Sequence, residues 1–397
     1  MPVFELRSPL TAEERQYKRK LILRDVVALL SLFAITAALA VATYFLFNSF
    51  ARRRQALAER WLERGESAMS NGHPEQAVDA FRSALEYDPG QRETEIKLAM
   101  ALSAAGRTEE AVSYFNTLLE SEPGNGLINL QLARLAAKQG SESRAVEYYQ
   151  RALDGRWQGD GYERRRMVRL ELTRYLINRK DYSKARTQLL VVAGNAPDDP
   201  KIKLEIAGLM EEAQDPASAF EIYQSIADRK PCPIEALEGA GRVAFALGRF
   251  QLARAYLERA ANHPDFGSQA ETVQSSNRKL LDATIHVLQL VPGTELPPKE
   301  RAARVLHAAE VAKGRLAACS TNTPTTSPSL ADLASRWQQI PAKSSPMVLA
   351  RDPQMEQTIM NLVFDTEKQT AATCEPPSGE DALLLKIAQS PMGVETQ

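Results

Sequence analysis

The sequence predicts an all-α protein, in which a solenoid of about six helix-turn-helix repeats lies between an N-terminal transmembrane helix and extra C-terminal helices. Two observations support this fold class. The first is a run of 26 residues without charge, 26–51. The second is an alanine that recurs at intervals of 34, 34, 40, 34 and 34 residues, at Ala77, Ala111, Ala145, Ala185, Ala219 and Ala253. A period of 34 residues is typical of helix-turn-helix arrays, and a generic alanine-rich bundle would not keep phase over six copies.

Composition and charge argue against several functions. The 49 Lys and Arg nearly balance the 50 Asp and Glu, so we expect no global attraction to nucleic acid. Three cysteines and four histidines are scattered, and neither Cys-x-x-Cys nor His-Glu-x-x-His occurs. We therefore expect no metal site and no cofactor.

The uncharged run follows a basic N-terminal tail, residues 1–25. As a helix, residues 26–51 would be about 39 Å long, which suffices to cross a hydrocarbon core of about 30 Å. The rival interpretation is a signal peptide cleaved after Ala38-Leu39-Ala40, but the apolar sequence continues beyond the usual length of such a segment. Residues 52–58 contain neither Gly nor Pro, so we hypothesise that the anchor runs directly into the first repeat.

The orientation of this anchor is not decided by its flanking charges, because five basic residues lie close to the run on each side. A short tail before a single span, followed by a large domain, favours a cytoplasmic tail and repeats on the non-cytoplasmic, periplasmic side.

The repeats carry further marked positions. In the first copy these are Trp61, Gly65, Ala77, Phe81, Ala84 and Pro89. Large residues return at Phe115, Tyr149 and Tyr223, and the glycine returns at Gly241. This pattern resembles the tetratricopeptide repeat (TPR), and with the anchor it is similar to membrane-anchored bacterial members. The resemblance implies antiparallel helix pairs in a right-handed superhelix over residues 58–264, and it implies binding of a protein or peptide partner.

In the family's register the first helix of each repeat lines a concave groove. Carried over residue by residue, this groove includes Glu66, Arg134, Lys138, Arg174, Asn178 and Arg242. The set lacks the Lys and Asn residues with which some members clamp a C-terminal carboxylate. Its arginines are suited to an acidic or phospho-acidic peptide, or they are solvated residues of a polar helix face.

The 40-residue interval places a glycine-rich insertion at residues 154–161. Insertions in repeat proteins map to loops, often on a binding face. Four arginines follow, at Arg164, Arg165, Arg166 and Arg169. They predict either a contact for an acidic partner or anionic lipid, or a solvated helix end.

Beyond the repeats, where the sequence resembles no family, we expect capping helices at 265–319 and a Ser/Thr/Pro linker at 320–329. Short helices at 330–389 and a disordered tail at 390–397 follow. Cys319 and Cys374 each end a predicted helix. Outside the cytoplasm a disulfide between them would contribute roughly 4 kcal/mol in the loop-entropy model. Two unpaired buried thiols are the alternative.

The sequence thus predicts a non-enzymatic, single-pass membrane scaffold, and analogy suggests a role in bacterial cell-envelope assembly. A cytoplasm-facing regulatory adaptor at the inner membrane is the alternative within this class. An enzyme with its site in residues 270–397 is the alternative of another class, but no nucleophile–base spacing or phosphate loop occurs there.

Overall fold

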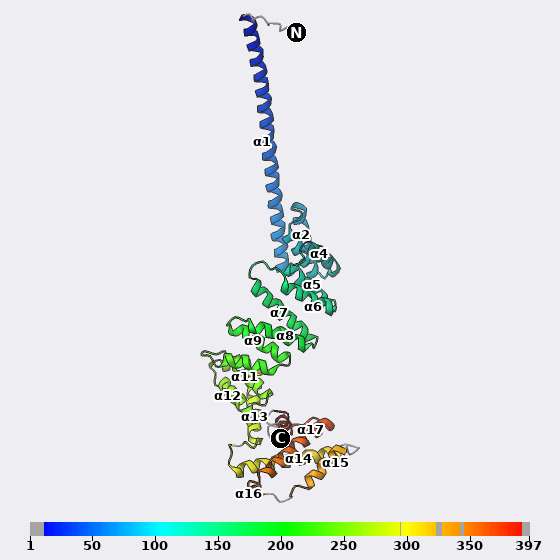
Figure 1. Ribbon diagram of the computed structural model, residues 1–397, viewed down its shortest axis with the longest axis vertical. Coiled ribbons are helices and arrows are strands. Elements are labelled where there is room, and N and C mark those ends of the chain that lie inside the picture. The colour runs from blue at the N-terminus through cyan, green and yellow to red at the C-terminus, as the bar shows by residue number, and fades with distance from the viewer. Residues whose placement is uncertain (1–11, 294, 323–327, 342–344, 391–397) are drawn as a thin grey trace, which may run out of the picture. The chain divides into compact units, whose positions relative to one another are not determined.

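The computed structural model describes residues 12–293, 295–322, 328–341 and 345–390, and in that part the fold is all-α, as predicted (Figure 1). The chain forms two compact units, residues 1–165 and 166–397. The boundary falls within α7 (Gly161–Asn178), just after the glycine-rich insertion. Most of the predicted disordered tail and the first part of the basic tail lie outside the described residues.

The first unit contains three helix pairs. Its helices are α1 (Ala12–Ser70), α2 (Pro74–Tyr87), α3 (Arg92–Ala104), α4 (Thr108–Ser121), α5 (Gly126–Lys138) and α6 (Glu142–Asp154). The 59 residues of α1 form one uninterrupted helix, so the apolar segment does continue into the first repeat (Figure 1). The first buried side chain of α1 is Ala58, where the repeats were expected to begin.

The apolar part of α1 has no protein contact that would cover it. An 18-residue window of α1 reaches a mean hydropathy of 2.4, and none of that window is buried. Within the described residues this is the one helix long and apolar enough to cross a membrane. The hydroxyls of Ser31, Thr36 and Thr43 donate to carbonyls one turn earlier in the helix, so none of the three needs water as an acceptor.

The recurring alanines are the points of closest helix approach. All six are fully buried, and so are Phe81 and Phe115 four residues after the first two. Opposite these side chains the preceding helix carries small residues. A Cβ atom on Gly65 would overlap the ring of Phe81, and one on Gly241 would overlap Leu257. In these two helix pairs a large side chain of the second helix therefore packs directly over a glycine of the first helix.

The second unit begins with the remaining repeats and ends in a helical bundle. Its helices after α7 are α8 (Tyr182–Gly194), α9 (Pro200–Glu212), α10 (Pro216–Ala227), α11 (Ile234–Ala246), α12 (Phe250–Ala261), the 3-10 turn η1 (Pro264–Ser268), α13 (Glu271–Leu290), α14 (Pro298–Asn322), α15 (Pro328–Gln338), α16 (Pro346–Leu349), α17 (Pro353–Thr373) and α18 (Gly379–Ala388).

The helices after η1 share one hydrophobic core, rather than forming separate capping and C-terminal parts. Val305 of α14, Trp337 of α15 and Val363 of α17 belong to this core, and Phe250 of the last repeat joins it. The bundle therefore covers the end of the repeat array, as a capping element must.

The predicted linker is shorter than expected because α14 continues to Asn322. Ser320 and Thr321 donate their hydroxyls to carbonyls of the same helix, which lets these residues stay helical. Residues 323–327, the remainder of the linker before α15, lie outside the described residues.

Cys319 near the end of α14 and Cys374 after α17 are joined by a disulfide, with Cα atoms 5.8 Å apart. Cys232 is free and partly exposed. Asp352 caps α17 by accepting a hydrogen bond from the Met355 amide. Ser378-x-x-Asp381 before α18 has the sequence of a capping box, but within the described residues Ser378 makes no side-chain cap bond.

The packing at Gly65 predicts opposite effects for two glycine substitutions in first helices. Gly65→Ala should destabilise the first repeat by about 1–3 kcal/mol, because the new methyl group meets the Phe81 ring. Gly208→Ala in α9 should stabilise by up to about 1 kcal/mol, because its Cβ meets only the Tyr223 hydroxyl at 3.8 Å. Hydrogen exchange in α2 and α9 measures the two effects locally. Equal effects would contradict this account of the packing.

Candidate partner-binding surfaces

The predicted groove residues of the first unit lie on its first helices, on a surface we call the first-helix face. Glu66 of α1 and Arg134 and Lys138 of α5 are all exposed. Glu66 accepts a hydrogen bond from Lys97 of α3 at 2.6 Å, and Lys97 also contacts Glu93 at 2.7 Å. The charge of Glu66 is therefore balanced by the next repeat.

The predicted arginines of the second unit are paired in the same way. Arg174 of α7 donates to Glu205 of α9. Arg242 of α11 donates to both carboxylate oxygens of Glu211, at 2.7 and 3.1 Å. Asn178 is exposed near the end of α7. Two of the arginines expected to meet an acidic peptide thus already hold carboxylates of neighbouring repeats.

These pairs follow one rule that the sequence reading missed. Glu66–Lys97, Arg174–Glu205 and Glu211–Arg242 each join residues 31 apart. Because the repeat is 34 residues long, two residues 31 apart lie on the first helices of consecutive repeats. The ion pairs therefore connect successive repeats. The Tyr223 hydroxyl adds a 2.8 Å bond to Glu211. Burial, and then the Glu211 charge, raise the pKa of Tyr223, so this phenol remains a donor.

The first-helix face of the first unit also presents apolar side chains. Leu62, Met69, Met100 and Leu127 are partly buried and pack on the core of the unit. Charged side chains such as Glu66 and Lys138 accompany them on the same face. The family register could have located these residues, since they occupy its second, fifth, ninth and twelfth positions.

The glycine-rich insertion forms a loop that is folded back onto the first unit. Gly126 donates to the carbonyl of Arg156 at 2.9 Å, and Arg156 donates to that of Gly124 at 2.7 Å. The Trp157 indole donates to the Ala152 carbonyl and covers Gly126, where a Cβ would overlap the ring. The loop therefore anchors the start of α5 to the end of α6.

The basic cluster after the insertion is partly structural as well. Arg165 donates to the carbonyls of Leu153 and Gly155, both at 2.9 Å, which fixes the end of α6. Arg169 donates to the Gln188 side chain at 3.3 Å. Arg164 is exposed. These contacts weaken the prediction that all four arginines serve an acidic partner.

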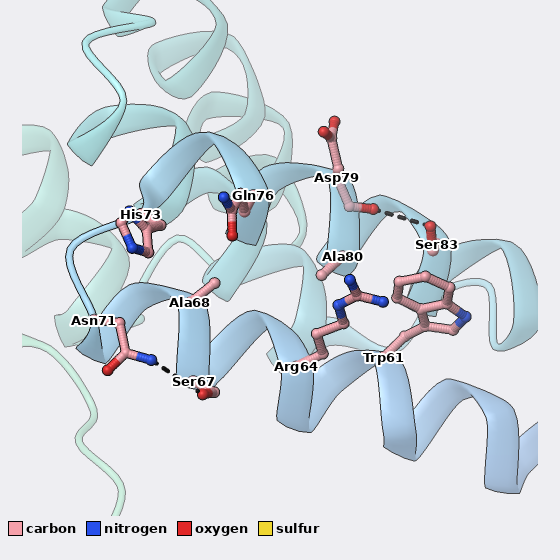
Figure 2. A pocket seen from close by; sticks show the side chains of 10 residues that line it. All are labelled: Trp61, Arg64, Ser67, Ala68, Asn71, His73, Gln76, Asp79, Ala80 and Ser83. Atoms are coloured by element: carbon pink, nitrogen blue, oxygen red, sulfur yellow. Dashed lines mark hydrogen bonds between the residues drawn. The ribbon is translucent and has the colours of Figure 1, made fainter.

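A hollow of about 570 Å³ lies between α1 and α2 (Figure 2). Its polar lining includes Arg64 and Ser67 from α1, and Asp79 and Ser83 from α2. The Arg64 guanidinium lies 5.1 Å from the centre of the Trp61 ring. Sequence reasoning used Trp61 only as a repeat marker and did not find this site.

The C-terminal bundle, where an enzyme site was the alternative, contains a group of titratable side chains around the buried Glu367. Glu367 of α17 is fully buried, and neither of its carboxylate oxygens has a hydrogen-bond partner among the described residues. Burial, and then the charge of Asp381, raise the pKa of Glu367 to about 8, against the opposing effect of Arg315. Burial also raises the pKa of Asp381. Glu367 is closed to solvent and thus to a substrate in this conformation.

Comparison with known families identifies the repeats. Two tetratricopeptide-repeat family models match, at residues 68–121 and 96–160. This chain carries tetratricopeptide repeats. Residues 68–160 therefore carry the repeat that is typical of scaffolds for protein interaction.

No curated protein matches the chain. Several solved TPR-type structures are similar to it. Pseudomonas aeruginosa pilF is 18% identical, with 57% of this chain and 98% of that chain covered and a TM-score of 0.38. PilW, a type IV pilus biogenesis factor, is 18% identical, with 55% and 97% covered and a TM-score of 0.38. YrrB, a TPR protein with an unusual peptide-binding site, is 15% identical, with 51% and 99% covered and a TM-score of 0.37.

The buried carboxyl of Glu367 predicts that the C-terminal bundle loses stability as pH rises. Its pKa is raised from 4.5 to about 8, so the folded state keeps a proton that the unfolded state releases. This stabilisation is complete below pH 4.5 and is lost as pH approaches 8, at no more than about 1.4 kcal/mol per pH unit. Glu367→Gln should make the free energy of unfolding of the bundle less dependent on pH between pH 4.5 and about 8.

Urea unfolding followed by Trp337 fluorescence, with Trp61 and Trp157 replaced by Phe, measures this effect in the bundle. Exposed Glu310, on α14 of the same bundle, supplies the control Glu310→Gln, which should keep the wild-type pH profile. A wild-type profile in Glu367→Gln would show that another group carries the dependence.

Proposed function

We propose that this protein is a single-pass membrane scaffold whose TPR repeats hold a protein or peptide partner close to the bilayer, in assembly or maintenance of a bacterial cell envelope. The observation that carries the proposal is the continuity of α1. One helix contains both the uncovered apolar segment and the first helix of the first repeat. Exposed apolar surface of this extent is stable in lipid rather than in water.

A rigid connection has a functional consequence. Because no flexible linker separates the apolar segment from the first repeat, a partner bound to the first unit is held near the membrane surface. From residue 51 to Ala58 the helix rises only about 10 Å. The scaffold therefore presents its partner at short range, not at the end of a tether.

The first-helix face of the first unit supports a partner segment with apolar anchors. Leu62, Met69, Met100 and Leu127 would contact its apolar side chains, as grooves do in helix or peptide recognition. Exposed Lys138 at the end of α5 favours an acidic residue in the same segment. Arg174 and Arg242 would accept an acidic partner only by exchanging Glu205 and Glu211 for it.

The Cys319–Cys374 disulfide supports a non-cytoplasmic, periplasmic location for the repeats. Structural disulfides persist in oxidising compartments and are rare in the cytosol. A cytoplasm-facing adaptor would instead keep both thiols reduced. The scaffold role needs no catalytic group, and the proposal assigns none.

Thiol labelling of intact cells whose outer membrane has been permeabilised tests both the anchor and its orientation. A membrane-impermeant maleimide should label Cys232 without reductant, and should label Cys319 and Cys374 only after reduction. The Cys232→Ser variant should show no label before reduction. All signal should remain in the membrane fraction after carbonate washing.

Two results would contradict this proposal in different ways. Labelling only after lysis, with no need of reductant, would place the repeats in the cytoplasm. Release of the chain by carbonate would remove the membrane anchor itself.

A further inference from the structure

The hollow on α1 and α2 lies where a TPR array normally continues. In α7, Leu172 and Leu176 occupy two of the positions equivalent to Arg64, Ser67 and Ala68 and are buried, whereas Tyr175 at the third is partly exposed. In the first helices of the other later repeats, all three equivalent positions are apolar and buried, and each of these helices packs against the second helix of the preceding repeat. These positions are Leu98, Ala101 and Leu102 in α3, Leu132, Leu135 and Ala136 in α5, Ile206, Leu209 and Met210 in α9, and Ala240, Val243 and Ala244 in α11. In the first repeat this face has no preceding repeat to cover it, and its side chains are mostly polar.

This open face carries one charge of each sign. Arg64 and Asp79 are both exposed, and within the described residues neither forms an ion pair. Figure 2 shows the Asp79 carboxylate pointing away from the Arg64 guanidinium, with Asp79 on α2 and Arg64 on α1. The two residues therefore do not satisfy each other within one chain.

Arg64 and Asp79 nevertheless lie at nearly the same position along the axis of α1. Gly65 faces Phe81 across the α1–α2 contact, so Arg64 and Asp79 lie within about one helical turn of each other along the axis. A two-fold axis along the bilayer normal places equivalent residues of two copies at the same height above the membrane. It would bring Arg64 of one copy to Asp79 of the other, and the reverse, as an isologous interface requires.

We propose that a second copy of this chain docks on the open face of the first repeat, with reciprocal Arg64–Asp79 ion pairs between the copies. The parallel arrangement rests on the proposed membrane anchor, which aligns two α1 helices in one bilayer. The open face carries both an arginine and an aspartate, so two copies can pair these charges with each other. This self-complementarity favours a second copy over a different partner. The small lining residues Ser67 and Ser83 leave room for the approach.

Cross-linking in membranes tests the pairing directly. Two differently tagged full-length chains, both Cys232→Ser, are co-expressed, one with Arg64→Cys and one with Asp79→Cys. Mild oxidation should yield a covalent dimer carrying both tags. Ser113 is exposed and equivalent to Asp79 in the second repeat, so Ser113→Cys replaces Asp79→Cys in the matched control and should yield no such dimer.

Charge reversal supplies a second measurement on the detergent-solubilised chain. Arg64→Glu or Asp79→Lys alone should lower the dimer fraction about tenfold or more, because like charges then meet, and the double variant should restore it. A monomeric wild type, failure of the double variant to recover, or a cross-link to a different protein in place of the second copy would overturn the proposal.

The two experiments distinguish a wrong membrane anchor from a wrong interface between copies. A chain lost from the membrane fraction but still cross-linked in detergent would refute the anchor and keep the interface. A membrane-bound chain without the two-tag dimer would keep the anchor and refute the interface.

Discussion

The unbroken backbone of α1 is the constraint on which the rest of the first unit depends. Helix continuity requires that every residue between the apolar segment and Gly65 keep helical geometry, and neither Gly nor Pro interrupts it there. The same helix then offers Gly65 to Phe81, and this contact seats α2 on α1. The first repeat is thus built directly on the helix that we propose as the membrane anchor.

Two kinds of contact hold the helices of the repeats together. Small residues let helices within a repeat approach, and ion pairs at a separation of 31 residues join first helices of successive repeats. Exposed pairs of this kind contribute only about 0–1 kcal/mol each, so the buried alanines and large side chains carry most of the stability. The pairs matter more for binding, because they decide which charges of the first-helix face remain open to a partner.

Periodicity was sufficient to predict the repeats because each marked residue has a purely steric role that does not depend on distant sequence. The alanines, Gly65 and Phe81 are buried where the register placed them. The predicted groove charges were less informative, because Arg174 and Arg242 depend on carboxylates contributed by another repeat. The contacts of the insertion could not be predicted for a similar reason. Its glycines indicate a loop, but the packing of Trp157 on Gly126 joins this loop to the start of α5, which precedes it by a whole helix pair. The buried Glu367 lies in the region without family resemblance, where no register exists to indicate burial.

The central claim is that anchor and first repeat are one rigid helix. Spin labels at Ser49→Cys and Ser70→Cys, in a Cys232→Ser chain diluted with unlabelled protein in bilayers, measure this by electron–electron distance. Residues 49 and 70 are 21 positions apart, so a continuous α-helix predicts a single narrow distribution of distances centred at about 32 Å. A broad distribution, or a clearly shorter mean distance, would show a hinge between membrane and repeats and would contradict the account.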